Sequence, residues 1–263
     1  MTFDPAALPL DGRLVMITGA AKRLGRALAL VTARAGAHVA LHYGRSRDAA
    51  EQTADEIRSL GRRAEVFHAD LADPAQVADL FQQAQARLGI IHVLINNASI
   101  FAPLDWQQTT LAEWEQHLRV NLTAPFLLTQ AFARALPPGE NGRVLNLLDW
   151  RALRPGPDHL PYTISKAGLA ALTRSLAVAL APRIQVNGLA LGAILPANED
   201  EPSGSPETPK VPMPGELDEV IRPVPARRWA ELAEVGQAAL FLLAGPTYVI
   251  GEILHLDGGR HLV

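Results

Sequence analysis

Seven short apolar runs, separated by helix-length segments, most constrain what this chain can fold into. Most of them are nearly continuous in apolar residues, as in parallel strands that are buried on both faces. The runs cover 14–18, 38–43, 64–69, 92–98, 143–149, 184–191 and 253–257. The predicted helices between them include 48–60, 74–88, 111–136 and 162–180. This alternation predicts an α/β fold with a doubly wound, seven-stranded parallel sheet and helices on both faces.

A proline-rich segment interrupts the alternation at about 195–225. It is too long and too rich in proline for an ordinary connection. It follows the carboxyl end of a strand, where ligands bind in this architecture. We therefore expect a substrate lid here, with a flexible surface insertion as the alternative. No repeat or linker divides the chain, so a single domain spanning 1–263 is predicted.

Composition narrows the class of partner. The net charge of −3 gives no reason to expect nucleic acid or an anionic membrane, and no apolar run is long enough to span a bilayer. Because there is no cysteine, disulfides, thiolate nucleophiles and zinc–sulfur sites are excluded. A metal site is not expected either, since His38 and His42 would lie roughly 13 Å apart along a strand. A cytoplasmic protein that binds a small molecule is predicted.

Two glycines after the first predicted strand indicate a dinucleotide site of Rossmann type. Gly19 permits a tight turn, and Gly25 lets strand and helix approach closely, so the helix amino terminus can face a pyrophosphate. Alone, two glycines six residues apart also match many surface turns.

The end of the second predicted strand indicates which dinucleotide is bound. It is followed by Arg45 and Ser46 rather than by an acid. A carboxylate there would bind the ribose 2′-hydroxyl of NAD and repel a 2′-phosphate, whereas arginine pairs with that phosphate. NADPH is therefore the predicted cofactor, and a solvated basic turn is the alternative. Asp70, after the third strand, suits either a contact with the adenine amino group or a helix cap.

Tyr162 and Lys166 are the candidate catalytic pair. They are four residues apart, so their side chains lie on one face of a predicted helix. A nearby ammonium favours the phenolate and lowers the phenol pKa, which is about 10 when unperturbed, so that the phenol can donate a proton near neutral pH. Taken alone, the spacing is also that of an exposed Tyr–Lys pair.

Several motifs occur together: the glycine loop, Asn96-Asn97-Ala98, Asn121 in a long helix, the Tyr–Lys pair, Asn187-Gly188 and Asp257-Gly258-Gly259. In this combination the chain resembles the short-chain dehydrogenase/reductase family over nearly its whole length. The resemblance implies that Tyr162 donates a proton, that Lys166 binds the nicotinamide ribose and tunes Tyr162, and that Asn121 holds a water in the proton relay. It also implies a homotetramer. The implied cofactor contacts are Gly19, Arg23, Leu24, Gly25, Tyr43, Arg45, Ser46, Asp70, Leu71, Asn97, Ala98, Tyr162, Lys166 and Gly192.

Three positions depart from the family pattern. Gly192 follows leucine where the family usually has proline, at the turn that the resemblance places beside the nicotinamide. Asp149, thirteen residues before Tyr162, stands where the family has its catalytic serine. Arg23 stands where the loop usually has its second glycine. A carboxylate facing a carbonyl oxygen that gains negative charge would raise the barrier to ketone reduction.

Arginine and aspartate at these two positions occur together in the pteridine reductases of the family. The chain also resembles them in LHYGRS, NNASIF and YTISK, and its end, DGGRHLV, is similar to that of bacterial dihydromonapterin reductases. The resemblance implies that the substrate is bound by Arg23, Ser99, Phe101, Asp149 and Tyr162.

Each implied role has a chemical rationale. A pterin presents amino and ring N–H donors, from which Asp149 can accept while it relays a proton with Tyr162 to a ring nitrogen. Arg23 would span the cofactor phosphates and the polar edge of the pterin, Ser99 would hydrogen-bond cofactor or substrate, and Phe101 would stack on the ring. The alternatives are a core aromatic for Phe101 and a solvent-exposed arginine for Arg23.

The predicted function is therefore an NADPH-dependent pteridine reductase that converts a dihydropterin to a tetrahydropterin. One alternative is a carbonyl reductase of the same family, acting on an oxoacyl or polyol substrate, which Asp149 disfavours. Another is a sensor that binds NADPH without turnover, which the intact Tyr162 and Lys166 disfavour.

Overall fold

The computed structural model describes residues 9–194 and 217–263. The strands are β1 (Leu14–Ile17), β2 (His38–Tyr43), β3 (Ala64–His68), β4 (Val93–Asn96), β5 (Gly142–Asp149), β6 (Ile184–Leu191) and β7 (Ile253–Leu256). The helices are α1 (Arg23–Arg34), α2 (Arg47–Ser59), α3 (Pro74–Leu88), α4 (Leu111–Leu118), α5 (Ala124–Ala135), α6 (Leu160–Leu180), α7 (Leu217–Ile221) and α8 (Leu232–Ala244). Shorter helical turns are η1 (Arg119–Thr123), η2 (Trp150–Ala152) and η3 (Arg260–Leu262).

The strands form one parallel sheet in the order β3-β2-β1-β4-β5-β6-β7. The chain begins near the middle at β1, builds outward to β3, returns to β4 beside β1, and continues to β7. The longest pairing runs along β5 and β6, from Gly142 opposite Ile184 to Asp149 opposite Leu191. This topology confirms the predicted doubly wound fold.

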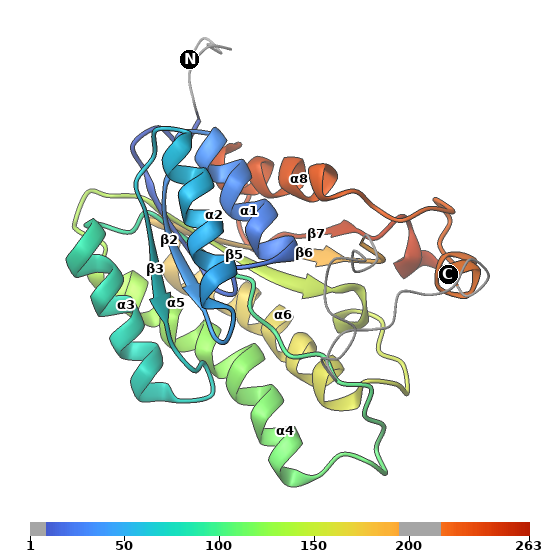
Figure 1. The fold of residues 1–263 in the computed structure, drawn as a ribbon. Coiled ribbons are helices and arrows are strands. Elements are labelled where there is room, and N and C mark those ends of the chain that lie inside the picture. The colour runs from blue at the N-terminus through green and yellow to red at the C-terminus, as the bar shows by residue number, and fades with distance from the viewer. Residues whose placement is uncertain (1–8, 195–216) are drawn as a thin grey trace.

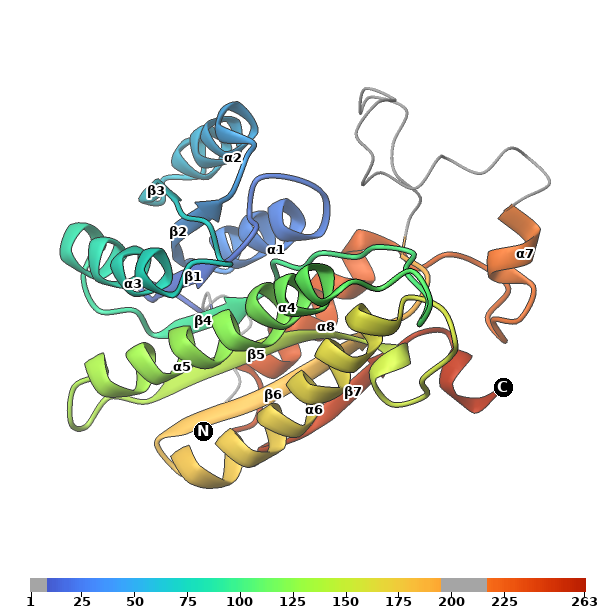
Figure 2. The ribbon, with the colours of Figure 1, turned by 90° about the horizontal axis from the view of Figure 1, so that it is seen from below.

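Helices cover both faces of the sheet. Figure 1 shows α1, α2 and α8 on one face and α3, α5 and α6 on the other, and Figure 2 looks onto the second group. A hydrophobic core lies on each face of the sheet, and alternate residues of one strand point into different cores. Val15 and Ile17 of β1 pack with α1 and α8, and Met16 packs with α3 and α5. Because both faces are buried, the strands are apolar along their length, which is the pattern read from the sequence.

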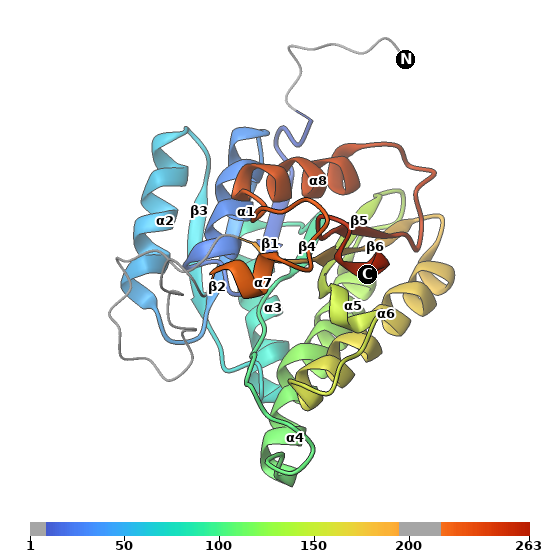
Figure 3. The ribbon, with the colours of Figure 1, turned by 90° about the vertical axis from the view of Figure 1, so that its right-hand side faces the viewer.

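The carboxyl ends of all seven strands meet at one edge of the sheet. In Figure 1 the arrowheads of β5, β6 and β7 point toward this edge, and Figure 3 shows the molecule from that side, with α7 in front. The residues that end or directly follow the strands are Thr18, Tyr43, Ala69, Asn97, Asp149, Gly192 and Asp257. The candidate site lies here. Most of the predicted lid falls on residues 195–216, which are outside the described residues, so the lid stays a prediction.

The single long helix predicted over 111–136 is wrong in detail. The segment forms α4, a π-helical turn at η1, and α5. Pro125 stands in the first turn of α5 and has no backbone N–H to donate to the preceding turn. A wider π-helical turn accommodates that missing donor, and such turns are common at functional sites. Asn121 lies in this turn.

Candidate active site

The turn between β1 and α1 has the shape of a phosphate loop. Gly19 has a φ of +65°, which glycine adopts without steric cost. A Cβ on Gly25 would lie 2.0 Å from the Gly19 carbonyl oxygen, so only glycine lets α1 begin this close to the turn. Asn97 Nδ2 donates to the carbonyl oxygens of Thr18 at 2.9 Å and Gly19 at 3.1 Å. These contacts join the loop to the end of β4.

Arg23 is the first residue of α1, and its backbone explains the usual preference for glycine here. Its φ is +49°, in the left-handed region, which costs an ordinary residue about 1–2 kcal/mol. The side chain is exposed at the carboxyl edge of the sheet. Exposure is compatible with both interpretations of Arg23. The strained backbone favours the functional one, because such strain clusters at ligand sites.

The ends of β2 and β3 form the side on which adenosine is expected. Tyr43 and Ser46 are half-buried, Leu71 is buried, and Arg45 and Asp70 are exposed. Ser46 is the N-cap of α2. The helix-cap interpretation of Asp70 is wrong, because the N-cap of α3 is Asp73, whose side chain accepts the N–H of Ala75. Asp70 Oδ1 instead accepts the N–H of Ala72 at 2.9 Å in the preceding turn.

Asn121 holds the loop that follows β4. It is fully buried, and its Oδ1 accepts the N–H of Ile100 at 2.9 Å. Its Nδ2 donates to the carbonyl oxygen of Ile100 and to Ser165 Oγ, both at 3.0 Å. Asn121 therefore connects the loop carrying Ser99 and Phe101 to α6. The role expected for it in holding a relay water stays a prediction.

Asp149 and Tyr162 are directly joined. The Tyr162 hydroxyl donates to Asp149 Oδ2 at 3.0 Å, and Asp149 Oδ1 accepts the N–H of Arg151 at 2.8 Å. Burial raises the pKa of the Asp149 carboxyl, although the Arg151 N–H, the Arg151 charge, Tyr162 and Lys166 oppose that shift. Burial, and then the Asp149 charge, raise the pKa of the Tyr162 phenol well above its usual value. The pair therefore favours its protonated forms.

The expectation that Lys166 lowers the pKa of Tyr162 is not met by this geometry. Lys166 Nζ donates to the carbonyl oxygen of Leu147 at 2.7 Å and lies 5.8 Å from the centroid of the Tyr162 ring. The Asp149 carboxylate is nearer to the phenol and has the opposite effect on its pKa. Burial also lowers the pKa of Lys166 itself to about 8. Both side chains do share one face of α6, as their spacing predicts, and both are buried rather than exposed.

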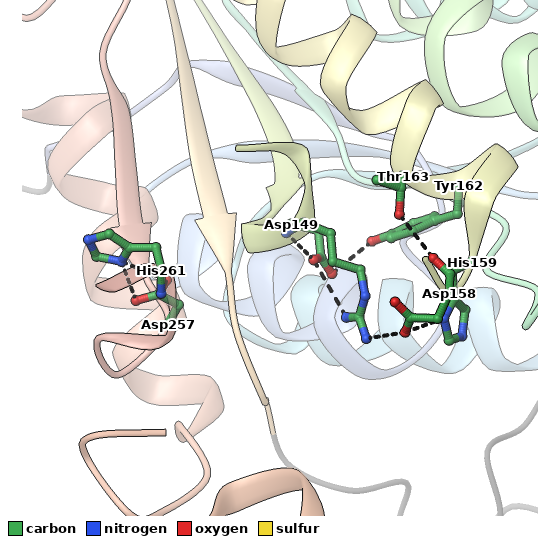
Figure 4. A network of polar contacts seen from close by, with 8 residues as sticks. Asp149, Asp158, His159, Tyr162, Thr163, Asp257 and His261 are labelled. Atoms are coloured by element: carbon green, nitrogen blue, oxygen red, sulfur yellow. Dashed lines mark hydrogen bonds and ion pairs between the residues drawn. The ribbon is translucent and has the colours of Figure 1, made fainter. Parts of the chain in front are cut away.

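A polar network extends from Asp149 along the segment that leads into α6 (Figure 4). The Arg151 guanidinium lies 3.8 Å from Asp149 Oδ1 and donates to Asp158 Oδ2 at 2.9 Å. Asp158 Oδ2 also lies 2.9 Å from His159 Nδ1. Sequence reasoning missed Arg151, Asp158 and His159. The only available signal was a cation two residues after Asp149, and that carries no information about side-chain direction.

Phe101 lies beside Tyr162 rather than in the core. Its ring stacks on His159, with centroids 4.1 Å apart, and meets Tyr162 edge-on at 4.6 Å. It is 40% exposed, so the core-aromatic interpretation is wrong, and the Arg151 guanidinium lies 5.9 Å from its ring centroid. Ser99, two residues earlier, is exposed as well. The structure thus brings Asp149, Tyr162 and Phe101 together at one place.

Gly192 directly follows Leu191, which pairs with Asp149 across β5 and β6. A Cβ at Gly192 would lie 2.6 Å from the Asp257 Cα, so glycine is required even though leucine precedes it. Asp257 is buried and accepts the N–H groups of Gly259 at 3.0 Å and His261 at 2.9 Å. Asp257 therefore closes the carboxyl-terminal turn, and Figure 4 shows its contact with His261.

The residues at this edge fit a dinucleotide. The turn at Gly19 lies close against the start of α1, where a Cβ on Gly25 would collide with the Gly19 carbonyl oxygen, and the buried Lys166 ammonium lies beside β5, whose end carries Asp149. Within 9–194 and 217–263, no cluster of three His, Asp or Glu side chains is arranged to hold a metal ion. None of the helices described has the length and apolar character needed to cross a membrane.

Comparisons with known proteins agree with this geometry. Residues 13–204 match the family described as short chain dehydrogenase. A short-chain type dehydrogenase/reductase of Picea abies is 32% identical, covering 95% of this chain and 93% of that protein. A 3-oxoacyl-[acyl-carrier-protein] reductase of Aquifex aeolicus is 30% identical, covering 96% of this chain and 98% of that protein.

Among solved structures, the chain is also similar to an enzyme with another substrate. The alternative dihydrofolate reductase 1 (FolM) of Brucella canis, in complex with NADP, is 35% identical with a TM-score of 0.87. The match covers 98% of this chain and 97% of that protein.

Proposed function

Since the chain belongs to the short-chain dehydrogenase family, we propose that it is an NADPH-dependent pteridine reductase that converts a dihydropterin to a tetrahydropterin. One observation carries the proposal: a buried carboxyl, Asp149, accepts the hydroxyl of the catalytic tyrosine at 3.0 Å. Burial raises the pKa of this carboxyl, which shifts it toward the form that can deliver a proton.

The cofactor assignment is supported by the phosphate loop and by the cation after β2. The turn at Gly19 and Gly25 suits a pyrophosphate at the start of α1. Arg45 stands where a 2′-phosphate would lie, and no acid at the end of β2 would repel it. The complex of the FolM relative with NADP supports the same assignment.

The substrate assignment is supported by the groups around Asp149. A pterin ring is flat and carries N–H donors, which match a partly exposed aromatic ring at Phe101 and an acceptor at Asp149. Arg23 and Ser99 are exposed at the same edge and would contact the polar rim of the ring. The likeness to an alternative dihydrofolate reductase, an enzyme of a pteridine substrate, points the same way.

The chain's own residues account for the proton. When bound, NADPH supplies a hydride to a ring carbon of the C=N bond. The Asp149 carboxyl gives its proton to the ring nitrogen, and a solvent proton passed along the Tyr162 hydroxyl restores it, so that Tyr162 ends the cycle protonated. Arg151, 3.8 Å away, offsets the negative charge that remains on Asp149. Lys166 would bind the nicotinamide ribose, and Asn121 keeps the Ser99–Phe101 loop in place.

A carbonyl reductase is the second candidate, because several curated relatives are 3-oxoacyl-[acyl-carrier-protein] reductases. At position 149 this chain lacks the neutral hydroxyl donor of serine, and Asp149 in its ionised form would oppose negative charge on a carbonyl oxygen. The further proposals are a single domain over 1–263, a lid at about 195–225, a cytoplasmic location and a homotetramer.

The substitution Asp149→Ser tests the assignment. It restores a neutral donor at the position and removes the acceptor and proton carrier. We expect dihydropterin turnover to fall by about a hundredfold or more, the usual scale for a positioned proton-transfer group. NADPH affinity and thermal stability should change little, because the residue lies at a strand end facing the substrate. NADPH oxidation is to be followed with dihydrobiopterin, dihydromonapterin, dihydrofolate and a panel of ketones. Full pterin activity in this variant would remove the chemical basis of the proposal and favour carbonyl reduction.

A further inference from the structure

His42 lies near the carboxyl end of β2. Its imidazole forms hydrogen bonds with residues that follow β1 and β3 in the chain. It is 2% exposed. Its Nδ1 accepts the backbone N–H of Gly19 at 3.0 Å, in the phosphate loop after β1. Its Nε2 lies 3.0 Å from the carbonyl oxygen of Ala69, directly after β3. One imidazole therefore joins the ends of three neighbouring strands.

The two contacts define the state of the ring. The Gly19 N–H can only donate, so Nδ1 must be the unprotonated nitrogen. The Ala69 carbonyl can only accept, so Nε2 must carry the hydrogen. Both conditions are met by a single neutral tautomer and by no charged form. Burial lowers the pKa of His42 to about 4, with smaller opposing effects from Ala69 and Asp70 and a further lowering from His68. At neutral pH the required tautomer is therefore the one present.

Each joined segment is part of the expected adenosine half of the cofactor site. Gly19 forms the turn under the pyrophosphate. Tyr43, next to His42 in the chain, leads into Arg45, which is expected at the 2′-phosphate. Ala69 precedes Asp70, which is expected at the adenine. We propose that His42 is a positioning residue for NADPH: its neutral ring fixes these three segments relative to one another so that they bind the cofactor together.

His38 provides an internal control on the same strand. It lies at the opposite end of β2, and its Nδ1 accepts the backbone N–H of Arg63 at 3.0 Å. The kind of hydrogen bond is the same as that between His42 and Gly19. The amino edge of the sheet, however, carries none of the expected cofactor contacts. A bond that only stabilises the sheet should behave alike at both ends.

The test compares asparagine and leucine at each histidine. The two replacements are close in shape, but only the asparagine Oδ1 can take the place of Nδ1 as an acceptor. Dissociation constants for NADPH and for adenosine 2′,5′-bisphosphate are to be measured by calorimetry, with melting temperatures recorded in parallel. We expect His42→Leu to weaken both ligands by about tenfold or more, because the Gly19 N–H and the Ala69 carbonyl lose buried partners. His42→Asn keeps an acceptor for Gly19 but loses the bond to Ala69, so it should weaken both ligands clearly less than His42→Leu does, by about threefold. His38→Asn and His38→Leu should bind both ligands unchanged.

His42→Gln guards against a leucine variant that does not fold. Its amide reaches the position of Nε2 and can still donate to Ala69, but it offers Gly19 no acceptor at Nδ1. Ligand binding by His42→Gln should therefore be weakened, but less than in His42→Leu, because the bond to Ala69 remains. The proposal is overturned if His42→Leu or His42→Gln melts at a lower temperature yet binds both ligands with the original affinity. It is also overturned if His42→Asn loses as much affinity as His42→Leu.

Discussion

At the scale of single residues, the proposed roles of Asp149 and Arg151 predict how pterin turnover depends on pH. Asp149 has a raised pKa and delivers its proton in the proposed reaction, so the protonated form is the active one. Pterin turnover should therefore fall as pH rises through the Asp149 pKa, with the midpoint above the ordinary aspartate value of about 3.9. The Arg151 charge opposes this shift. Arg151→Met should raise the Asp149 pKa further and move the fall in activity to higher pH.

Asp149→Asn serves as the control for this profile. It cannot titrate, so its residual turnover should show no fall at that pH. Steady-state rates of NADPH oxidation with a dihydropterin, measured across the pH range at saturating cofactor, give all three profiles. A profile for Arg151→Met that coincides with that of the original protein would contradict the assignment of the titrating group to Asp149.

At Arg23, the contribution of the side chain to ligand binding can be measured separately from the effect of its backbone conformation on stability. Its φ of +49° is unfavourable for any residue with a Cβ and costs glycine nothing. Arg23→Gly should therefore raise the free energy of unfolding by about 1 kcal/mol relative to Arg23→Ala. Both variants lack the guanidinium, so both should bind dihydropterin more weakly and NADPH somewhat more weakly. Urea unfolding and ligand titration measure the two effects separately. Equal unfolding free energies in the two variants would contradict the argument from strain.

At the scale of elements, the hydrogen bonds by which His42 joins the ends of β1, β2 and β3 predict how the free energy of unfolding depends on pH. The pKa of His42 is about 4 when folded and near 6.5 when unfolded, so the unfolded chain binds more protons between these values. The contribution of His42 is fully present above about pH 6.5 and is lost as pH falls toward 4. The unfolding free energy of the original protein should drop relative to that of His42→Asn by about 2 kcal/mol between about pH 7 and pH 5.

Urea unfolding of both proteins at the two pH values measures this difference. Subtracting the variant removes the titration of every other group, because the two chains differ only at residue 42. A difference in unfolding free energy that does not change with pH would mean that His42 is not held in its neutral form.

The strands and helices were largely predictable from the sequence, because burial on the sheet faces requires apolar residues within each short segment. Both faces of the sheet are covered, so each strand is an apolar run, and β2 and β6 begin and end where their runs do. The ends of α1, α2 and α3 are marked in the sequence by Gly36, Gly61 and Gly89, which all have positive φ. The π-helical turn at η1 was not predicted, because Pro125 was interpreted as lying within one continuous helix over 111–136.

The site was predictable as a set of residue types and less so as a set of interactions. Spacing placed Tyr162 and Lys166 on one helical face, and the resemblance placed Asp149 beside them. The pKa of Tyr162 could not be predicted, because it depends on which charge is nearer in three dimensions. Asp158 and His42 were missed for the same reason: their partners, Arg151 and Gly19, are brought to them by the fold.

At the scale of the whole molecule, the cofactor site draws on both halves of the doubly wound sheet. The phosphate loop and the ends of β2 and β3 lie on one side of the β1–β4 junction, and Asp149, Tyr162 and Gly192 lie on the other. A ligand held by both halves binds only the folded chain. It therefore stabilises the molecule by mass action, by about 2.7 kcal/mol at a concentration one hundred times its dissociation constant.

Thermal unfolding should consequently report the cofactor preference. NADPH should raise the melting temperature more than NADH at equal concentration, because a charge-assisted pair between Arg45 and the 2′-phosphate is worth about 1.5–3 kcal/mol, or tenfold or more in affinity. Arg45→Ala should abolish most of that difference while leaving the smaller shift produced by NADH nearly unchanged. Arg47→Ala, at a neighbouring exposed arginine in the first turn of α2, is the matched control and should keep the preference. Equal shifts from the two cofactors in the original protein would exclude a 2′-phosphate site at the end of β2.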